Sequence, residues 1–158
     1  MSSKIRRSRP QQKVFLSAPF TQKMDLRRGV LRPKYKLFLY TIKVGLERLG
    51  YSTYLAHERE KWGRARCHPA EFVREDFRAL RSSSLIIAYL EKRLSTGVLV
   101  ELGWASALRK PVILFAHDRS VVPLIIQGLN HTLCSLRIVQ ASSAGEIVAY
   151  VEQATRRS

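Results

Sequence analysis

The side chains best suited to chemistry in this sequence are acids within predicted helices. Glu101 lies in a segment of helical periodicity, Gly97 to Leu108, which follows the short apolar run Leu85–Leu90. In open parallel α/β sheets, ligands bind beyond the carboxyl ends of the strands, where helix N-termini also point. A carboxylate there can act as a nucleophile, or it can simply be a solvated acid that interacts with the helix dipole.

A second carboxylate, Asp76, lies in the predicted helix from Pro69 to Arg81, which precedes the same apolar run. Two carboxylates can divide the cleavage of a glycosidic bond, because one attacks or stabilises the anomeric carbon while the other protonates the departing group. Considered alone, such an aspartate is more often an acid on the surface of a helix than a catalyst.

Five short apolar runs alternate with helical segments, and this pattern predicts an α/β fold. We expect a flavodoxin-like or Rossmann-like, doubly wound sheet of five parallel strands in the order 2-1-3-4-5. The predicted strands are Lys13–Leu16, Tyr51–Ala56, Leu85–Leu90, Val112–Ala116 and Leu136–Val139. The predicted helices are Tyr35–Leu49, Pro69–Arg81, Gly97–Leu108, Val121–Leu129 and Ser142–Ala154.

The length of 158 residues fits a single domain, which we place at residues 13–158 after a flexible basic arm at 1–12. The chain has no apolar run long enough to span a membrane, and its start lacks the apolar core of a secretory signal. Cys67 and Cys134 have neither metal-type spacing nor a disulfide framework. We therefore expect a cytoplasmic protein without a metal site.

The charge is strongly basic, at +16, and it is uneven along the chain. Residues 1–66 contain 17 Lys and Arg against 4 Asp and Glu. Such an excess attracts polyanions, so nucleic acid is one partner that the charge would suit. A biased composition is the explanation we favour, and we do not favour nucleic acid as the partner. The segment Thr21 to Pro33 is polar and basic, and we expect it to be a loop over the site.

Three motifs together resemble the nucleoside 2-deoxyribosyltransferase-like superfamily. They are VFLSAPF at residues 14–20, ExxxED at 71–76 and GxxxELGxA at 97–105. This group includes the transferases and the N-hydrolases that split nucleoside 5'-monophosphates into base and sugar phosphate. The resemblance implies that Glu101 is the nucleophile that forms a glycosyl-enzyme intermediate and that Asp76 does acid/base work at the nucleobase. It implies no metal and no organic cofactor.

Ser95 and Gly97 favour the hydrolases within this group. The transferases usually have an aspartate at the position of Ser95, whereas the hydrolases have a serine that binds the 5'-phosphate. A serine at a helix N-terminus is also suited to phosphate binding on physical grounds. The resemblance further implies a homodimer, in which Ser120 or Arg119 of a neighbouring subunit could approach the phosphate.

The remaining predicted substrate contacts lie at the ends of the first two strands. The resemblance assigns the loop of residues 17–20 to the sugar, and His57 ends the second predicted strand. The predicted substrate-binding residues are Ser17, Ala18, Pro19, Phe20, His57, Ser95, Gly97 and Ser120.

The sequence therefore predicts an N-glycosidase that hydrolyses a nucleoside 5'-monophosphate of a pyrimidine or modified base. Transfer of 2-deoxyribose between bases is the alternative reaction. A protein that binds nucleotides or nucleic acid without catalysis is the alternative of another class, and the basic first half of the chain supports it.

Overall fold

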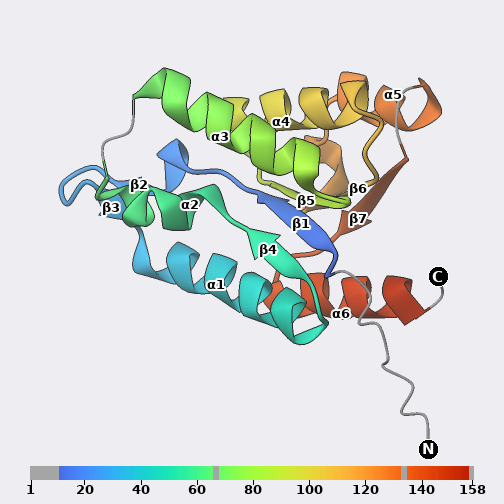
Figure 1. The fold of residues 1–158 in the computed structure, drawn as a ribbon, viewed down its shortest axis with the longest axis horizontal. Coiled ribbons are helices and arrows are strands. Elements are labelled where there is room, and N and C mark those ends of the chain that lie inside the picture. Colours follow the sequence, from blue (N-terminus) through green and yellow to red (C-terminus); the bar gives the residue numbers. More distant parts are fainter. Residues whose placement is uncertain (1–10, 66–67, 133–134, 157–158) are drawn as a thin grey trace, which may run out of the picture.

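The computed structural model describes residues 11–65, 68–132 and 135–156 (Figure 1). Residues 1–10 of the predicted basic arm, together with Cys67 and Cys134, lie outside the described residues. No helix in the described part of the chain is both long and apolar enough to cross a bilayer.

The central sheet has five parallel strands in the order β4-β1-β5-β6-β7. Counted along the chain within this sheet, that is the predicted order 2-1-3-4-5, which the structure confirms. The strands are β1 (Lys13–Ser17), β4 (Ser52–Tyr54), β5 (Leu85–Leu90), β6 (Val112–Ala116) and β7 (Leu136–Gln140).

Helices cover both faces of the sheet, so the fold is doubly wound (Figure 1). One face carries α1 (Pro33–Arg48) and α6 (Ala144–Arg156). The other face carries α3 (Pro69–Ser82), α4 (Thr96–Ala107) and α5 (Leu124–Thr132). A short helix, α2 (Ala56–Arg59), follows β4.

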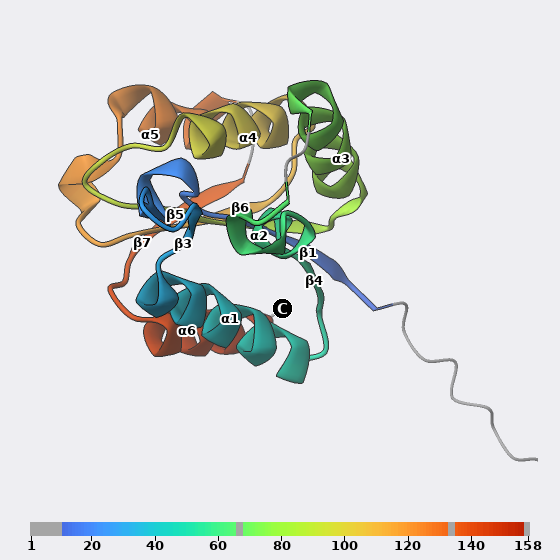
Figure 2. The ribbon, with the colours of Figure 1, turned by 90° about the vertical axis from the view of Figure 1, so that its left-hand side faces the viewer.

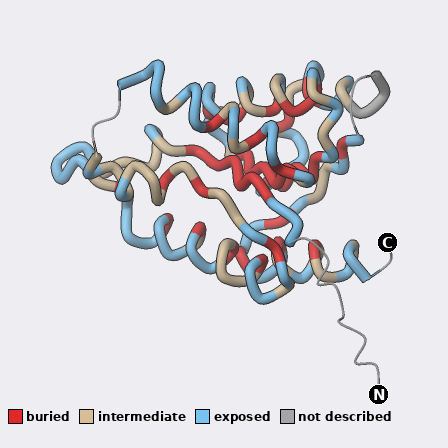
Figure 3. The backbone as a smooth tube through the Cα atoms, in the orientation of Figure 1, coloured by how far each residue is buried: buried red, intermediate tan, exposed pale blue. Residues whose placement is uncertain are grey.

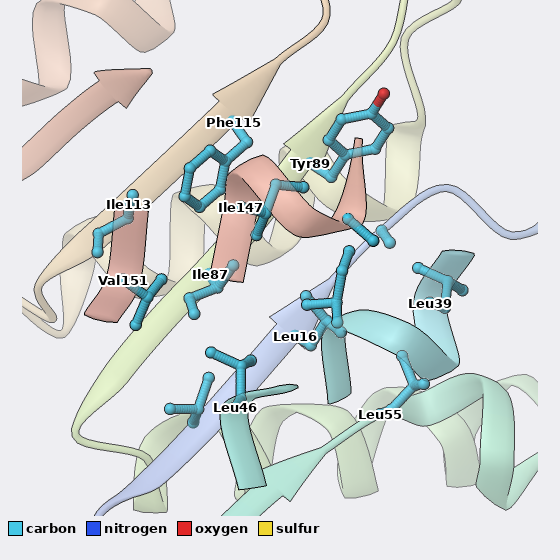
Figure 4. Packing of buried hydrophobic residues seen from close by; sticks show 14 of the residues in the cluster. Leu16, Leu39, Leu46, Leu55, Ile87, Tyr89, Ile113, Phe115, Ile147 and Val151 are labelled. Carbon is cyan, nitrogen blue, oxygen red and sulfur yellow. The ribbon is translucent and has the colours of Figure 1, made fainter. Parts of the chain in front are cut away.

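Burial on both faces explains why the strands read as continuous apolar runs. Along β5, Ile87 and Tyr89 belong to the core between the sheet and helices α1 and α6. Ile86, Ala88 and Leu90 belong to the core on the opposite face. Buried residues therefore concentrate in the middle strands (Figure 3), and Figure 4 shows the first of these cores. Complete burial of an aliphatic side chain contributes about 1.5–3 kcal/mol, so these two clusters fix the positions of the strand ends.

Local signals explain where several elements begin or end. Gly50 follows α1 with a φ of +93°, a left-handed conformation that glycine adopts at low cost. Ser143 caps α6: its Oγ accepts the Glu146 N–H, and the Glu146 carboxylate accepts the N–H groups of Ser142 and Ser143. This reciprocal arrangement is a capping box.

Two predicted boundaries are wrong. The second strand ends at Tyr54 rather than Ala56, because Ala56 begins α2, and His57 therefore lies in a helix. The helix predicted at Val121–Leu129 is a 3-10 helix, η3 (Arg119–Val121), followed by α5. Pro123 precedes α5 because proline has no N–H to donate within a helix.

The prediction of a loop from Thr21 to Pro33 is wrong, because this segment has regular structure. It contains a 3-10 helix, η1 (Thr21–Lys23), and two antiparallel strands, β2 (Met24–Asp25) and β3 (Val30–Leu31). We call residues 21–31 the lid hairpin. It packs against a second 3-10 helix, η2 (Lys61–Gly63).

Candidate active site

A cavity of about 470 Å³ opens at the carboxyl ends of β1 and β5, within the size range of small-molecule sites. Its walls come from the lid hairpin, α2, α3 and the start of α4, and Figure 2 looks onto this side of the molecule. The lining residues are Ala18, Phe20, Thr21, Gln22, Ala56, His57, Glu60, Phe72, Val73, Asp76, Ser95, Thr96, Gly97, Val98, Val100, Glu101 and Trp104.

Glu101 lies in the second turn of α4 and is partly exposed toward this cavity. Its Oε2 accepts a hydrogen bond from the hydroxyl of Ser17 at the end of β1. Removal from water raises the pKa of Glu101 to about 8; the bond from Ser17 opposes this rise, and the nearby charges of Asp76 and Glu60 add to it. The structure thus brings together two residues that lie 84 positions apart in the sequence.

Asp76 is buried on α3 and lines the same cavity. Its Oδ1 accepts a 2.8 Å hydrogen bond from the Tyr54 hydroxyl and lies 3.5 Å from Nη2 of Arg59. Burial raises the pKa of Asp76, while the contacts with Tyr54 and Arg59 oppose the rise. A carboxyl with a raised pKa can hold a proton for transfer.

Ser95, Thr96 and Gly97 line the cavity at the N-terminus of α4. Ser95 is the N-cap residue and is buried, yet its hydroxyl makes no capping hydrogen bond. The first N–H groups of a helix have no partner within the helix, and together with the helix dipole they favour an anion. This end of α4 is therefore suited to a phosphate, as the sequence predicted for Ser95 and Gly97.

His57 holds the loop after β1 in place. The Pro19 carbonyl can only accept, so His57 Nε2, at 3.2 Å, donates to it. The imidazole also packs edge-on against Phe20, with ring centroids 5.0 Å apart. Burial lowers the pKa of His57 to about 4, so the ring is neutral at pH 7. His57 thus fixes the wall that Ala18 and Phe20 form.

The model of the nucleoside 2-deoxyribosyltransferase family matches residues 30–150. The chain belongs to this family. No curated protein matches the chain in sequence.

Solved structures of low sequence identity share the fold of this family member. The CMP N-glycosidase BcmB from Clostridium botulinum has a TM-score of 0.67 and 22% identity, over 90% of this chain and 99% of the other. The solution structure of BlsM has a TM-score of 0.75 and 24% identity, over 93% and 91% of the two chains. A 2-deoxyribosyltransferase from Bacillus psychrosaccharolyticus has a TM-score of 0.62 and 18% identity, over 87% and 91%.

Ser120 is the predicted site residue that lies apart from the others. It is exposed in η3, where its N–H donates to the Asp118 carboxylate, and it does not line this chain's own cavity. A contact from a neighbouring subunit remains a prediction for this family member.

Sequence reasoning missed three residues around Asp76. Arg59 Nη2 lies 3.1 Å from Glu60 Oε1 as well as near Asp76, and Glu60 lines the cavity. Burial raises the pKa of Glu60, so the cavity contains a third carboxyl that resists ionisation. Tyr54 ends the edge strand, and Arg59 and Glu60 lie a few residues after it, a signal that could have placed all three near the site. The directions of Arg59 and Glu60 depend on the short helix α2, which the sequence pattern did not predict.

The mouth of the cavity is held by contacts that sequence reasoning also missed. In the lid hairpin, the Gln22 side-chain amide donates to the Leu94 carbonyl, and Lys23 forms an ion pair with Glu91. Both partners belong to the segment between β5 and α4. The lid hairpin is therefore attached to the loop that leads to Ser95.

Proposed function

We propose that the protein is an N-glycosidase that hydrolyses the base–sugar bond of a nucleoside 5'-monophosphate with a pyrimidine or modified base. The products are the free base and (deoxy)ribose 5-phosphate. The observation that carries the proposal is that Glu101 and Asp76 line one cavity, with the Ser17 hydroxyl bonded to Glu101. Membership of the family supports the reaction class.

In the first step, an oxygen of the Glu101 carboxylate attacks the anomeric carbon. The carbon–nitrogen bond breaks, its electron pair leaves with the base, and Asp76 donates a proton to the base. Tyr54 and Arg59 both engage Oδ1 of Asp76, so Oδ2 is the oxygen suited to carry that proton. The sugar phosphate is then esterified to Glu101.

In the second step, water attacks the anomeric carbon of this ester. The Asp76 carboxylate takes a proton from the water, and Glu101 departs as a carboxylate. Both residues return to their starting states, and no cofactor enters the balance.

The surroundings of Glu101 favour its ionised form more strongly in the transition state than in the empty cavity. With a pKa of about 8, only about a tenth of Glu101 is ionised at pH 7 in the empty cavity. An oxocarbenium-like transition state brings positive charge beside the carboxylate, and in a site of low dielectric that attraction is strong. The Ser17 hydrogen bond favours the ionised form further.

The N-terminus of α4 supports a phosphorylated substrate. Ser95 Oγ and the first N–H groups of the helix provide donors for a 5'-phosphate at the edge of the cavity that contains Glu101. The name of one structural relative, a CMP N-glycosidase, supports a nucleoside monophosphate as the substrate class.

Incubation with a panel of nucleosides and nucleoside 5'-monophosphates, followed by chromatography for free base, tests the proposal. We expect base release from at least one monophosphate and its loss in Glu101→Gln. Glu71→Gln, an exposed acid on α3, is the matched control and should keep full activity. Full activity of Glu101→Gln would exclude this mechanism.

The same assay separates the alternatives. If an added second base yields a new nucleoside, the protein is a deoxyribosyltransferase, the reaction named for the family and for one structural relative. If no nucleotide releases its base although one binds, the protein is a nucleotide-binding module.

A further inference from the structure

The lid hairpin, the start of α1 and η2 carry a cluster of cations that the proposed reaction does not use. Each of these side chains belongs to an exposed residue, and none lines the cavity. We call the cluster the cationic surface; it consists of Arg27, Arg28, Arg32, Lys34, Lys36, Lys61 and Arg64.

These residues form one surface because their segments pack together. A Cβ added at Gly63 in η2 would lie 2.6 Å from Met24 Cε in the lid hairpin, which shows how closely the two segments approach. Lys36 of α1 reaches η2, where its Nζ lies 4.8 Å from the centre of the Trp62 ring. The hairpin leads directly into α1, so the three segments are continuous in space (Figure 2).

Acidic residues neutralise little of this surface. Within residues 21–36 and 59–65 the acids are Asp25 and Glu60. Asp25 accepts the N–H groups of Arg27 and Arg28 within the hairpin turn, and its Oδ2 lies 4.0 Å from Nε of Arg28, so it offsets one of the seven cations. Glu60 faces the cavity and pairs with Arg59. The surface therefore retains a dense positive charge.

The charge also opposes the local fold. No acidic residue lies in the first turn of α1, where Arg32, Lys34 and Lys36 surround the positive end of the helix dipole. Cations there are unfavourable, since helices are stabilised by acids at this end. A bound polyanion would offset that repulsion.

The chemistry of the surface distinguishes among polyanions. The large apolar side chains exposed near these cations are Leu26 in the lid hairpin and Leu37 in α1, whereas stable membrane attachment requires a broad apolar face. The adjacent cavity has room for one nucleotide, which an unpaired strand can present but a duplex keeps stacked. Basic grooves that follow the backbone are the usual means of binding single strands.

We propose that the cationic surface binds single-stranded nucleic acid through its backbone phosphates, beside the mouth of the cavity. This binding function goes beyond base release from a mononucleotide, and it holds whether or not the proposed reaction occurs.

The test is a titration of the full-length protein against a fluorescent oligothymidylate at several salt concentrations. In the test variant, Arg27, Lys61 and Arg64 are replaced with Gln; in the control variant, Arg48, Arg81 and Arg137 are replaced with Gln. All six belong to exposed residues. Arg48 ends α1, Arg81 lies near the end of α3 and Arg137 is the second residue of β7, so the control positions are at the opposite end of the sheet. Both variants lose the same net charge.

We expect the wild type and the control variant to bind with similar affinity, and the test variant to bind at least about tenfold more weakly. Loss of three phosphate contacts should reduce the slope of log K against log salt by about 2, at about 0.7 per contact on a single strand. Base release by the test variant, measured separately, reports on the proposed function and not on this surface.

Three results would overturn the proposal. They are equal loss of affinity in both variants, equal or tighter binding of a duplex with the same number of phosphates, and equal displacement of the strand by inorganic polyphosphate at matched charge. The first would show that binding depends on the total charge of the protein and not on the cationic surface. The others would show that the surface does not select a single strand. Circular dichroism of both variants establishes that a loss is not caused by unfolding.

Discussion

Glu101 combines two properties that oppose each other in the free protein. A nucleophile must be ionised, yet burial raises the pKa of this carboxyl to about 8. The folded protein therefore holds a proton on Glu101 between pH 4.5 and 8, where the unfolded chain has released it. The contribution of Glu101 to the free energy of unfolding is then greatest below pH 4.5 and is lost as the pH rises through about 8.

Replacement of Glu101 with Gln should remove this pH dependence, because Gln stays neutral while its carbonyl can still accept from Ser17. We expect Glu101→Gln to raise the free energy of unfolding by about 1–3 kcal/mol more at pH 8.5 than at pH 4.5; water in the cavity reduces the full effect of the shift. Urea denaturation at both pH values measures the difference. An equal effect at both would show that Glu101 is not desolvated.

Asp76 depends on Tyr54 for its orientation, because the Tyr54 hydroxyl donates to one of its two oxygens. Tyr54→Phe removes that donor, so we expect a loss of about tenfold in kcat and a further rise in the pKa of Asp76, visible as a shifted pH profile. Tyr51→Phe is the matched control, since its hydroxyl bonds Thr155 away from the cavity. Both should lose about 1 kcal/mol of stability. If Tyr54→Phe and Tyr51→Phe changed kcat equally, Tyr54 would have no role in positioning Asp76.

At the scale of elements, the lid hairpin depends on its contact with η2. Gly63 has a φ of +97°, and a Cβ there would lie 3.1 Å from the backbone oxygen of Gly29 in the lid hairpin and 2.6 Å from the flexible end of Met24. We expect Gly63→Ala to destabilise the protein by about 1–3 kcal/mol and to raise KM more than it lowers kcat, because the lid hairpin forms one wall of the cavity.

Gly29→Ala is the control for Gly63→Ala. Gly29 also has a positive φ, of +63°, but no atom lies within 4 Å of an added Cβ. It should show the cost of backbone strain alone, about 1 kcal/mol, with little change in KM. Thermal unfolding and steady-state kinetics measure both variants, and equal KM values would contradict a role for the hairpin–η2 contact.

The elements with strong local signals were predictable from sequence. The apolar run of β5 predicted a buried strand, and Ser143 with Glu146 forms the cap that begins α6. The lid hairpin was not predictable, because two-residue strands such as β2 leave no periodicity to detect. Its position depends instead on contacts with η2 and with the loop after β5.

At the scale of the whole molecule, strand order brings the candidate site together. Adjacent pairing of β1 with β5 places Ser17 beside the start of α4 and Glu101. The order of the strands was predictable from the alternation of strands and helices, so the approach of Ser17 to Glu101 followed from it. The contacts of Tyr54 and Arg59 with Asp76 could not be predicted, because they depend on side-chain directions at the edge strand and in α2.

The most direct test of the central claim is a search for the sugar attached to Glu101. The protein is mixed with a monophosphate that it cleaves, quenched in acid within milliseconds, digested and analysed by mass spectrometry. We predict that the peptide containing Glu101 carries one sugar phosphate and that Glu101→Gln carries none. Base release without any protein-bound sugar, at an undiminished rate in Glu101→Gln, would contradict the claim.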